Sequence, residues 1–140
     1  MKKDDPLLSR AIDAMQRADF ETSFVITEAL AIEGDALARH FLGWHYHKGL
    51  GVTADDSKAV YWWQFAAESG IPEAQQGLGW AYEHGRGIDQ NIEQAYVWYA
   101  RAVVAGDQTA QDSLTELSRR LTARQIKQLE LQTPPNTVPT

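Results

Sequence analysis

Two tryptophans flanked by polar side chains are the residues of this sequence best suited to bind another molecule. Each is the middle of a triplet with i, i+4, i+7 spacing, which places the three side chains on one face of a helix. The triplets are His40, Trp44 and His47, and Gln76, Trp80 and Glu83. Exposed Trp beside polar groups is typical of residues that dominate the binding energy of protein interfaces. The pattern also fits a second interpretation, in which both Trp pack against neighbouring helices.

The histidines could suggest a metal site, because His40, His45, His47 and His84 are four potential ligands. His40 and His47 share a helical face, but about two turns, roughly 10 Å, separate them. A zinc site needs three or four convergent ligands at about 2 Å, and the chain contains no Cys. We therefore expect no metal and no other cofactor.

Two glycine-rich turns, Gly49-Leu50-Gly51 and Gly85-Arg86-Gly87, differ from phosphate-binding loops. A phosphate loop follows a strand and opens a helix, whereas these turns follow predicted helices, and positive φ explains both glycines. The sequence also lacks Cys, a Ser in an elbow motif and a helical H-E-x-x-H. We expect no catalytic residues and predict that the protein is not an enzyme.

A period of 36 residues organises the elements that would position these side chains. Eleven residues recur 36 positions later without a gap, namely Gly34, Ala38, Leu42, Gly43, Trp44, Tyr46, Gly49, Gly51, Ala59, Trp62 and Ala66. A period of this length is typical of stacked helical hairpins, which usually bind other macromolecules along an extended surface.

Each period reads as helix, turn, helix. Asp35 is suited to cap the first helix of the first copy, and Asp55 and the equivalent Asn91 are suited to cap the second helices. Gly34, Gly70 and Gly106 mark three helix ends. Among the residues expected to be buried in the second helix are Ala59, Trp62, Trp63 and Ala66. We expect Trp62 and Tyr46 to fill the space between hairpins, and Trp98, the equivalent of Trp62, to be buried as well.

The two copies resemble the Sel1-like repeat, a relative of the tetratricopeptide repeat. The resemblance rests on Ala38, Leu42-Gly43, Tyr46 and the turn Gly49-Leu50-Gly51-Val52, and on the stretch from Lys58-Ala59 through Trp62 to Ala66-Ala67 and Gly70. The second copy departs mildly from the pattern, with Ile88, Gln94 and Val103. The resemblance implies an adaptor without catalytic residues, with the first helix of each hairpin on the concave face.

The fold class predicted is therefore all-α, a right-handed α-solenoid of about eight helices in one domain. Residues 1–33 form an N-terminal capping hairpin, 34–69 and 70–105 two full repeats, and 106–131 a partial repeat with a capping helix that begins at a Thr122–Gln125 capping box. Residues 132–140 contain three prolines and no hydrophobic periodicity, and we predict that they are disordered.

The predicted function is to bind a partner protein or peptide in the concave groove. His40, Trp44, His47, Gln76, Trp80 and Glu83 form the predicted site, and Arg39, Gln75 and Asp112 are the positions to consider if both Trp are core. One alternative is a regulatory or immunity-type inhibitor that covers an enzyme's active site. An inhibitor of a nucleic-acid enzyme would concentrate acidic residues, whereas acid and base are mixed along this stripe. A small-molecule sensor is a third possibility.

Charge and composition restrict the partners and the location. The net charge is −6, with Lys and Arg scattered along the chain, so no nucleic acid is expected as a partner. The N-terminus has no apolar segment typical of a signal peptide, and no apolar run approaches the roughly 18 residues of a membrane span. We expect a cytoplasmic protein that is a monomer or a weak homo-oligomer.

Overall fold

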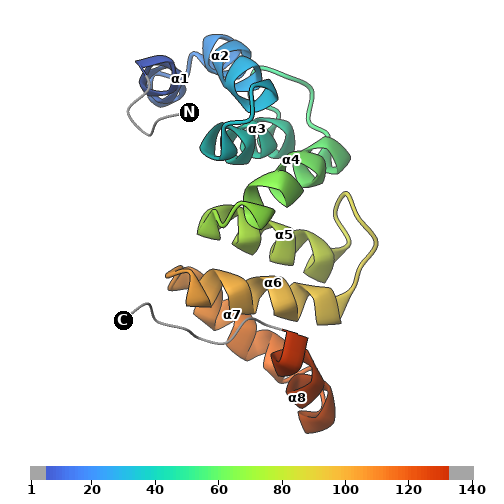
Figure 1. The fold of residues 1–140 in the computed structure, drawn as a ribbon. Coiled ribbons are helices and arrows are strands. Elements are labelled where there is room, and N and C mark those ends of the chain that lie inside the picture. Colours follow the sequence, from blue (N-terminus) through green and yellow to red (C-terminus); the bar gives the residue numbers. More distant parts are fainter. Residues whose placement is uncertain (1–5, 133–140) are drawn as a thin grey trace, which may run out of the picture.

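The computed structural model describes residues 6–132, which fold into eight helices without a strand (Figure 1). The helices are α1 (Pro6–Gln16), α2 (Phe20–Ile32), α3 (Ala36–Lys48), α4 (Asp56–Glu68), α5 (Pro72–His84), α6 (Ile92–Val104), α7 (Thr109–Ser118) and α8 (Ala123–Gln132). They pack in chain order as successive hairpins, and the predicted all-α solenoid is confirmed. None of these described helices is both long and apolar enough to cross a membrane.

The helices begin at the predicted caps. The side chains of Asp35, Asp55 and Asn91 each accept a hydrogen bond from the backbone N–H three residues on, at 2.7, 3.1 and 3.0 Å. The predicted capping box is also present, with Thr122 and Gln125 each accepting from the other's backbone N–H. These bonds satisfy amide groups that a helix start leaves free, so each boundary is determined locally.

The second glycine of each long turn touches the preceding hairpin. Gly51 lies against the backbone carbonyl of Phe20, the first residue of α2, and Gly87 lies against that of Asp56, the first residue of α4. A Cβ at either glycine would overlap the carbonyl oxygen. The turn of one hairpin is therefore seated on the second helix of the hairpin before it, which sets the spacing of the stack.

Of the aromatic residues expected to be buried in the second helices, Trp63 lies in the core, whereas Trp62 and Trp98 do not. Trp63 and Tyr99, also 36 positions apart, are only 3% and 2% exposed. Trp62 and Trp98 are partly exposed and pack against the core from its edge. The expectation that Trp62 fills the space between hairpins, and that Trp62 and Trp98 are buried, is therefore corrected, because the next residue along each helix is the one that is buried.

The predicted disordered tail lies outside the described residues, apart from Gln132, which ends α8. The structure therefore does not test that prediction.

A buried histidine makes stability dependent on pH. His45 donates from Nδ1 to the Leu50 carbonyl at 2.7 Å, so Nε2 accepts from the Ser23 hydroxyl at 3.2 Å. Burial lowers the pKa of His45 below its ordinary 6.5, and the bond to Leu50 opposes this shift only partly. The unfolded chain binds a proton near pH 6.5 and the folded chain only at lower pH, so stability is expected to fall below about pH 6.5.

Thermal unfolding at pH 7.5 and pH 5.5 measures this effect. His45→Gln keeps one donor and one acceptor and should reduce the loss on acidification, whereas His84→Gln at an exposed position should not. An equal loss in wild type and His45→Gln would assign the effect to other groups.

Candidate functional site

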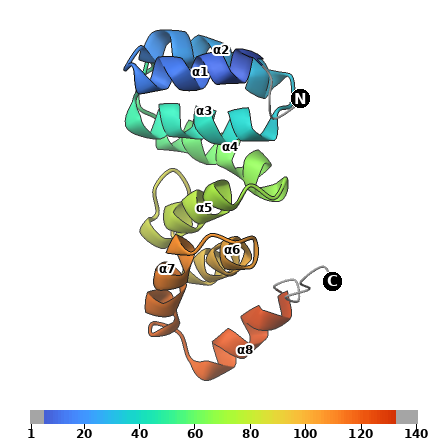
Figure 2. The same ribbon diagram turned by 90° about the vertical axis from the view of Figure 1, so that its left-hand side faces the viewer.

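Two neighbouring cavities lie along the first helices, and they are numbered from the N-terminal end. The second cavity, of about 380 Å³, is lined by four of the six predicted binding residues. It opens on the face that carries the first helix of each hairpin; Figure 2 shows α1 and α3 in front of α2 and α4 on this side. Its lining residues are Trp44, His47, Lys48, Trp63, Glu73, Gln76, Gly77, Trp80, Tyr99 and Ser113. The sequence thus identified most of the aromatic wall of this cavity.

The floor of the second cavity comes from the second helices. Trp63 reaches from α4 between α3 and α5, where its ring lies against Gly43 and Gly77. Tyr99 reaches from α6, and a Cβ at Gly79 would lie 2.9 Å from its ring. The absence of side chains at these glycines allows the rings to pass between the first helices, so both rings line the cavity.

A hydrogen bond holds Tyr99 in place. Its hydroxyl donates to Glu83 Oε1 at 2.8 Å. Burial raises the pKa of Tyr99, and the neighbouring Glu83 carboxylate raises it further. The hydroxyl therefore stays protonated at neutral pH, and Glu83 acts on the cavity through Tyr99.

His47 connects the cavity wall to the next repeat. Its Nδ1 lies 2.9 Å from Asp56 Oδ1, and Arg86 of the following turn lies 2.9 Å from Asp56 Oδ2. Burial alone would raise the pKa of Asp56, but the bonds from His47 and Arg86 outweigh it, and the pKa lies below its ordinary value. The His47 ring also contacts Trp80, with the centroids 4.9 Å apart. Asp56 is thus an ionised link between successive hairpins.

The two tryptophans lie at the boundary between core and solvent. Trp44 is 38% exposed and contacts the rings of His47 and Trp63. Trp80 is half-buried and packs against the core. Both of the interpretations left open by the sequence are therefore met in part, since each ring has one packed side and one side lining the cavity.

An apolar cavity of about 520 Å³, here called the first cavity, lies between α1 and α3. It is lined by Ala11, Ile12, Met15, Gln16, Ser23, Thr27, Phe41, Trp44, Lys48 and Leu50. Trp44 and Lys48 line both cavities. The two cavities are therefore neighbours that share these two residues as a common wall, and together they are called the groove.

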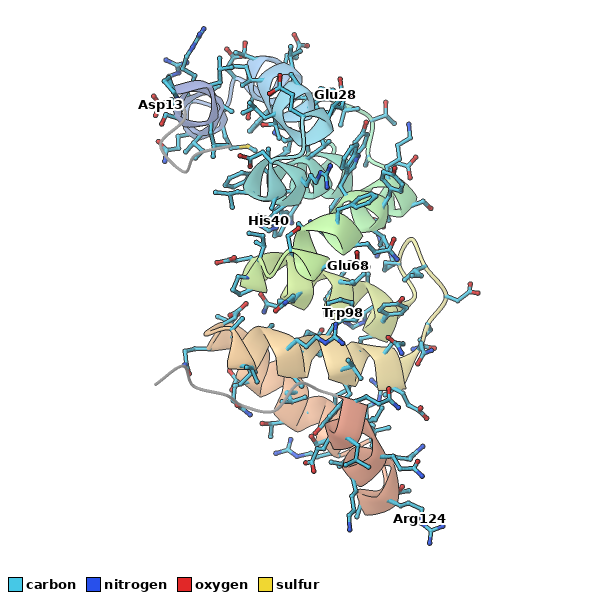
Figure 3. All side chains as sticks on the ribbon, in the orientation of Figure 1. Asp13, Glu28, His40, Glu68, Trp98 and Arg124 are labelled. Atoms are coloured by element: carbon cyan, nitrogen blue, oxygen red, sulfur yellow. The ribbon has the colours of Figure 1, made fainter. Side chains whose placement is uncertain are left out.

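His40 does not belong to the groove surface. Its side chain lies between α3 and α5 and is only 6% exposed (Figure 3). Burial lowers its pKa, although Glu73 opposes the shift. His40 is thus a core residue, and the binding surface predicted from the helical triplet must be drawn without it.

The three residues named as alternative site positions, Arg39, Gln75 and Asp112, lie outside the groove. Arg39 Nε and Gln75 Nε2 donate to the carbonyls of Ala31 and Ala67, at 3.0 and 3.1 Å. These equivalent bonds bind the end of one hairpin to the start of the next, so Arg39 and Gln75 are structural. Asp112 is exposed on α7 and lines neither cavity.

The groove combines an apolar cavity with a more polar one. Its walls offer aromatic rings, one ammonium and one carboxylate, Lys48 and Glu73. Within residues 6–132, no group of three or more His, Asp or Glu side chains is placed to hold a metal ion. Trp63 and Tyr99 were not among the predicted binding residues, and of the residues that line the first cavity only Trp44 was. The repeat register, which makes Thr27, Trp63 and Tyr99 equivalent, is the signal that could have revealed them.

The profile of the family described as Sel1 repeat matches residues 36–71 and 72–107. The two matches together cover half of the sequence, and the chain belongs to the Sel1 repeat family. Proteins built from these repeats generally mediate protein–protein interactions and are generally non-catalytic scaffolds.

Two solved structures share the fold. One is a protective antigen present in uropathogenic Escherichia coli strains, displaying an SLR fold, with a TM-score of 0.84 and 26% identity over 89% of this chain and 28% of that chain. The other is a Sel1 repeat protein from Oxalobacter formigenes, with a TM-score of 0.74 and 29% identity over 79% of this chain and 45% of that chain. This chain thus spans less than half the length of either protein. No curated protein matches the sequence.

Proposed function

We propose that the groove holds a segment of a partner protein and that the chain acts as an adaptor without catalysis of its own. The observation that carries this proposal is that the two cavities are neighbours on successive hairpins and share Trp44 and Lys48 as lining residues. Two distant pockets would suit separate small ligands, whereas neighbouring pockets along successive hairpins suit an extended chain that reaches both. The family's general role in protein–protein interactions supports the same conclusion.

The chemistry of the groove favours a polypeptide partner. The Trp44 ring offers a large contact area at a low cost in side-chain entropy, and the Lys48 ammonium lies 5.5 Å from its centroid. The nearest charges in the second cavity are mixed, Lys48 and Glu73, rather than uniformly basic or acidic. Nucleic acid requires a basic surface, and an inhibitor that imitates nucleic acid requires an acidic one, so a peptide of mixed character fits best.

Trp44→Ala is expected to weaken partner binding by about 2 kcal/mol, roughly 30-fold in Kd, because Trp at the centre of an interface commonly contributes this much. A partner captured from the host extract and then purified would be titrated by calorimetry against wild type and variant. Since Trp44 is exposed and borders both cavities, circular dichroism should show an unchanged helical fold.

Tyr61→Ala is the matched control. Tyr61 is an aromatic residue on α4, 53% exposed, and lines neither cavity of the groove. Its loss should leave Kd unchanged within about twofold. If Tyr61→Ala weakens binding and Trp44→Ala does not, the partner occupies the aromatic surface of α4 instead, and the groove proposal is wrong.

A further inference from the structure

One position of the repeat is occupied by a large ring in two hairpins and by a small side chain in the first. Thr27 of α2, Trp63 of α4 and Tyr99 of α6 are each eight residues into helices that start 36 positions apart. Trp63 and Tyr99 fill the space between successive first helices. Thr27 is too small to do so, and the first cavity lies where the equivalent ring would be.

The first helix explains why the chain does not fill this space itself. Ala11, Gly43 and Gly79 occupy the same place in α1, α3 and α5, five residues before the last residue of each helix. A Cβ at Gly43 would overlap the Trp63 ring. Ala11 carries such a Cβ and is 2% exposed, so a ring attached to residue 27 would collide with it. A ring that enters from the open side of the cavity comes from another direction and need not pass this Cβ.

The lining of the first cavity selects for an apolar group. Ile12, Met15, Phe41 and Leu50 contribute most of the large side chains. The hydroxyl of Ser23, at the floor, is already bonded to His45. A volume of about 520 Å³ lies within the usual range of ligand-binding pockets, and it accommodates a side chain as large as that of Trp.

The positive charge of Lys48 at the rim of the first cavity adds a second requirement for the partner. Lys48 is exposed and lines both cavities. Within the described part of the chain, Lys48 has a ring contact with Trp44 but no ion pair. A carboxylate of the partner placed here would meet a cation that no acidic side chain already neutralises.

We propose that the first cavity receives an aromatic side chain, Trp or Phe, of a partner peptide, which takes the place that Trp63 and Tyr99 fill in the later hairpins, with an acidic residue of the peptide beside it at Lys48. This inference rests on the proposed function, because it assumes that a partner segment lies in the groove. It adds the identity of the anchor and its position.

A peptide selection on the full chain tests the anchor. Random 12-residue peptides displayed on phage would be selected on the wild-type protein, and the winners synthesised with and without their aromatic residue. We expect enrichment of Trp or Phe next to Asp or Glu, and a loss of at least tenfold in affinity when that ring is replaced by Ala.

Variants of the protein locate the anchor. Thr27→Leu reduces the space in the first cavity and should weaken the selected peptides at least tenfold, whereas Val25→Leu, at a position 65% exposed on the same helix, should not. Lys48→Glu should weaken acidic peptides several-fold more than Lys127→Glu, which changes the net charge equally on α8.

Methyl NMR gives a readout that does not depend on any variant. The chain has two Met residues, and Met15 lines the first cavity. In protein with ¹³C-labelled Met methyl groups, an aromatic peptide or N-acetyltryptophanamide should shift the Met15 signal through the ring current, and an Ala-substituted peptide should not.

Three outcomes would overturn the inference. If Trp44→Ala weakens peptide binding and Thr27→Leu does not, the peptide occupies the second cavity alone, and the proposed function still stands. An unchanged Met15 signal at peptide saturation would exclude the first cavity directly. Laurate that binds the cavity and displaces no selected peptide would identify it as an acyl-chain site instead.

Discussion

Trp63→Ala is expected to lower the free energy of unfolding by about 3–5 kcal/mol, the usual loss when a buried Trp or Phe is truncated. The ring is 3% exposed and lies between Gly43 of α3 and Gly77 of α5. Because both neighbours lack side chains, neither can move in to fill the space. The loss is a large part of the total stability of a typical domain, so the variant should be partly unfolded at 37 °C.

Trp62→Ala provides the control, since it removes the same side chain from the next position of the same helix. Trp62 is only partly buried and packs on the outside of the core, so a loss of about 1–2 kcal/mol is expected, nearer the average for single substitutions. Urea denaturation followed by circular dichroism compares the two. If Trp62→Ala costs more than Trp63→Ala, the inward direction assigned to residue 63 is incorrect.

Gly87→Ala is expected to cost about 2–5 kcal/mol, for two reasons that add. Gly87 has a φ of +76°, a conformation that costs an L-residue about 1–2 kcal/mol. A Cβ there would also overlap the backbone carbonyl oxygen of Asp56, and relieving such overlap typically costs about 1–3 kcal/mol more. The carbonyl belongs to the first residue of α4, so the turn would have to lift off the preceding hairpin.

Gly70→Ala separates these two effects. Gly70 has a φ of +93°, but a Cβ there would meet no atom within 4 Å. Its cost should therefore be the conformational part alone, about 1–2 kcal/mol. Equal urea midpoints for Gly70→Ala and Gly87→Ala would mean that the close approach of the turn to Asp56 contributes nothing to the stability of the stack.

The sequence by itself determined the helices and their order, because these features depend on local chemistry. Asp55 and Asn91 cap helices through their own side chains, and Gly70 ends α4 by adopting a positive φ. Such signals involve residues within a few positions of one another, so a repeat of 36 residues displays them twice. Helical spacing also placed Trp44 with His47, and Trp80 with Gln76, on one face of their helices, whereas the concave position of these helices was inferred from the resemblance to the Sel1-like repeat.

Tertiary structure decided which side chains form the site. The aromatic pairs Trp62-Trp63 and Trp98-Tyr99 are adjacent in sequence, and only the angle at which the helices pack determines which member points inward. His40 has the correct spacing for the groove but is covered by the neighbouring hairpin. Spacing within one helix identifies a face, but it does not show how much of that face the next helix covers.

The first cavity is the clearest case of a feature that only the packed structure could reveal. Thr27 is an ordinary residue in a predicted helix, and nothing local to it indicates a binding site. The importance of Thr27 becomes clear only from the empty space between α1 and α3. In the next two hairpins, Trp63 and Tyr99 fill the corresponding space. A cavity is a property of several helices together, and it exists here because Thr27 is too small to fill the space and the Cβ of Ala11 would obstruct a larger ring.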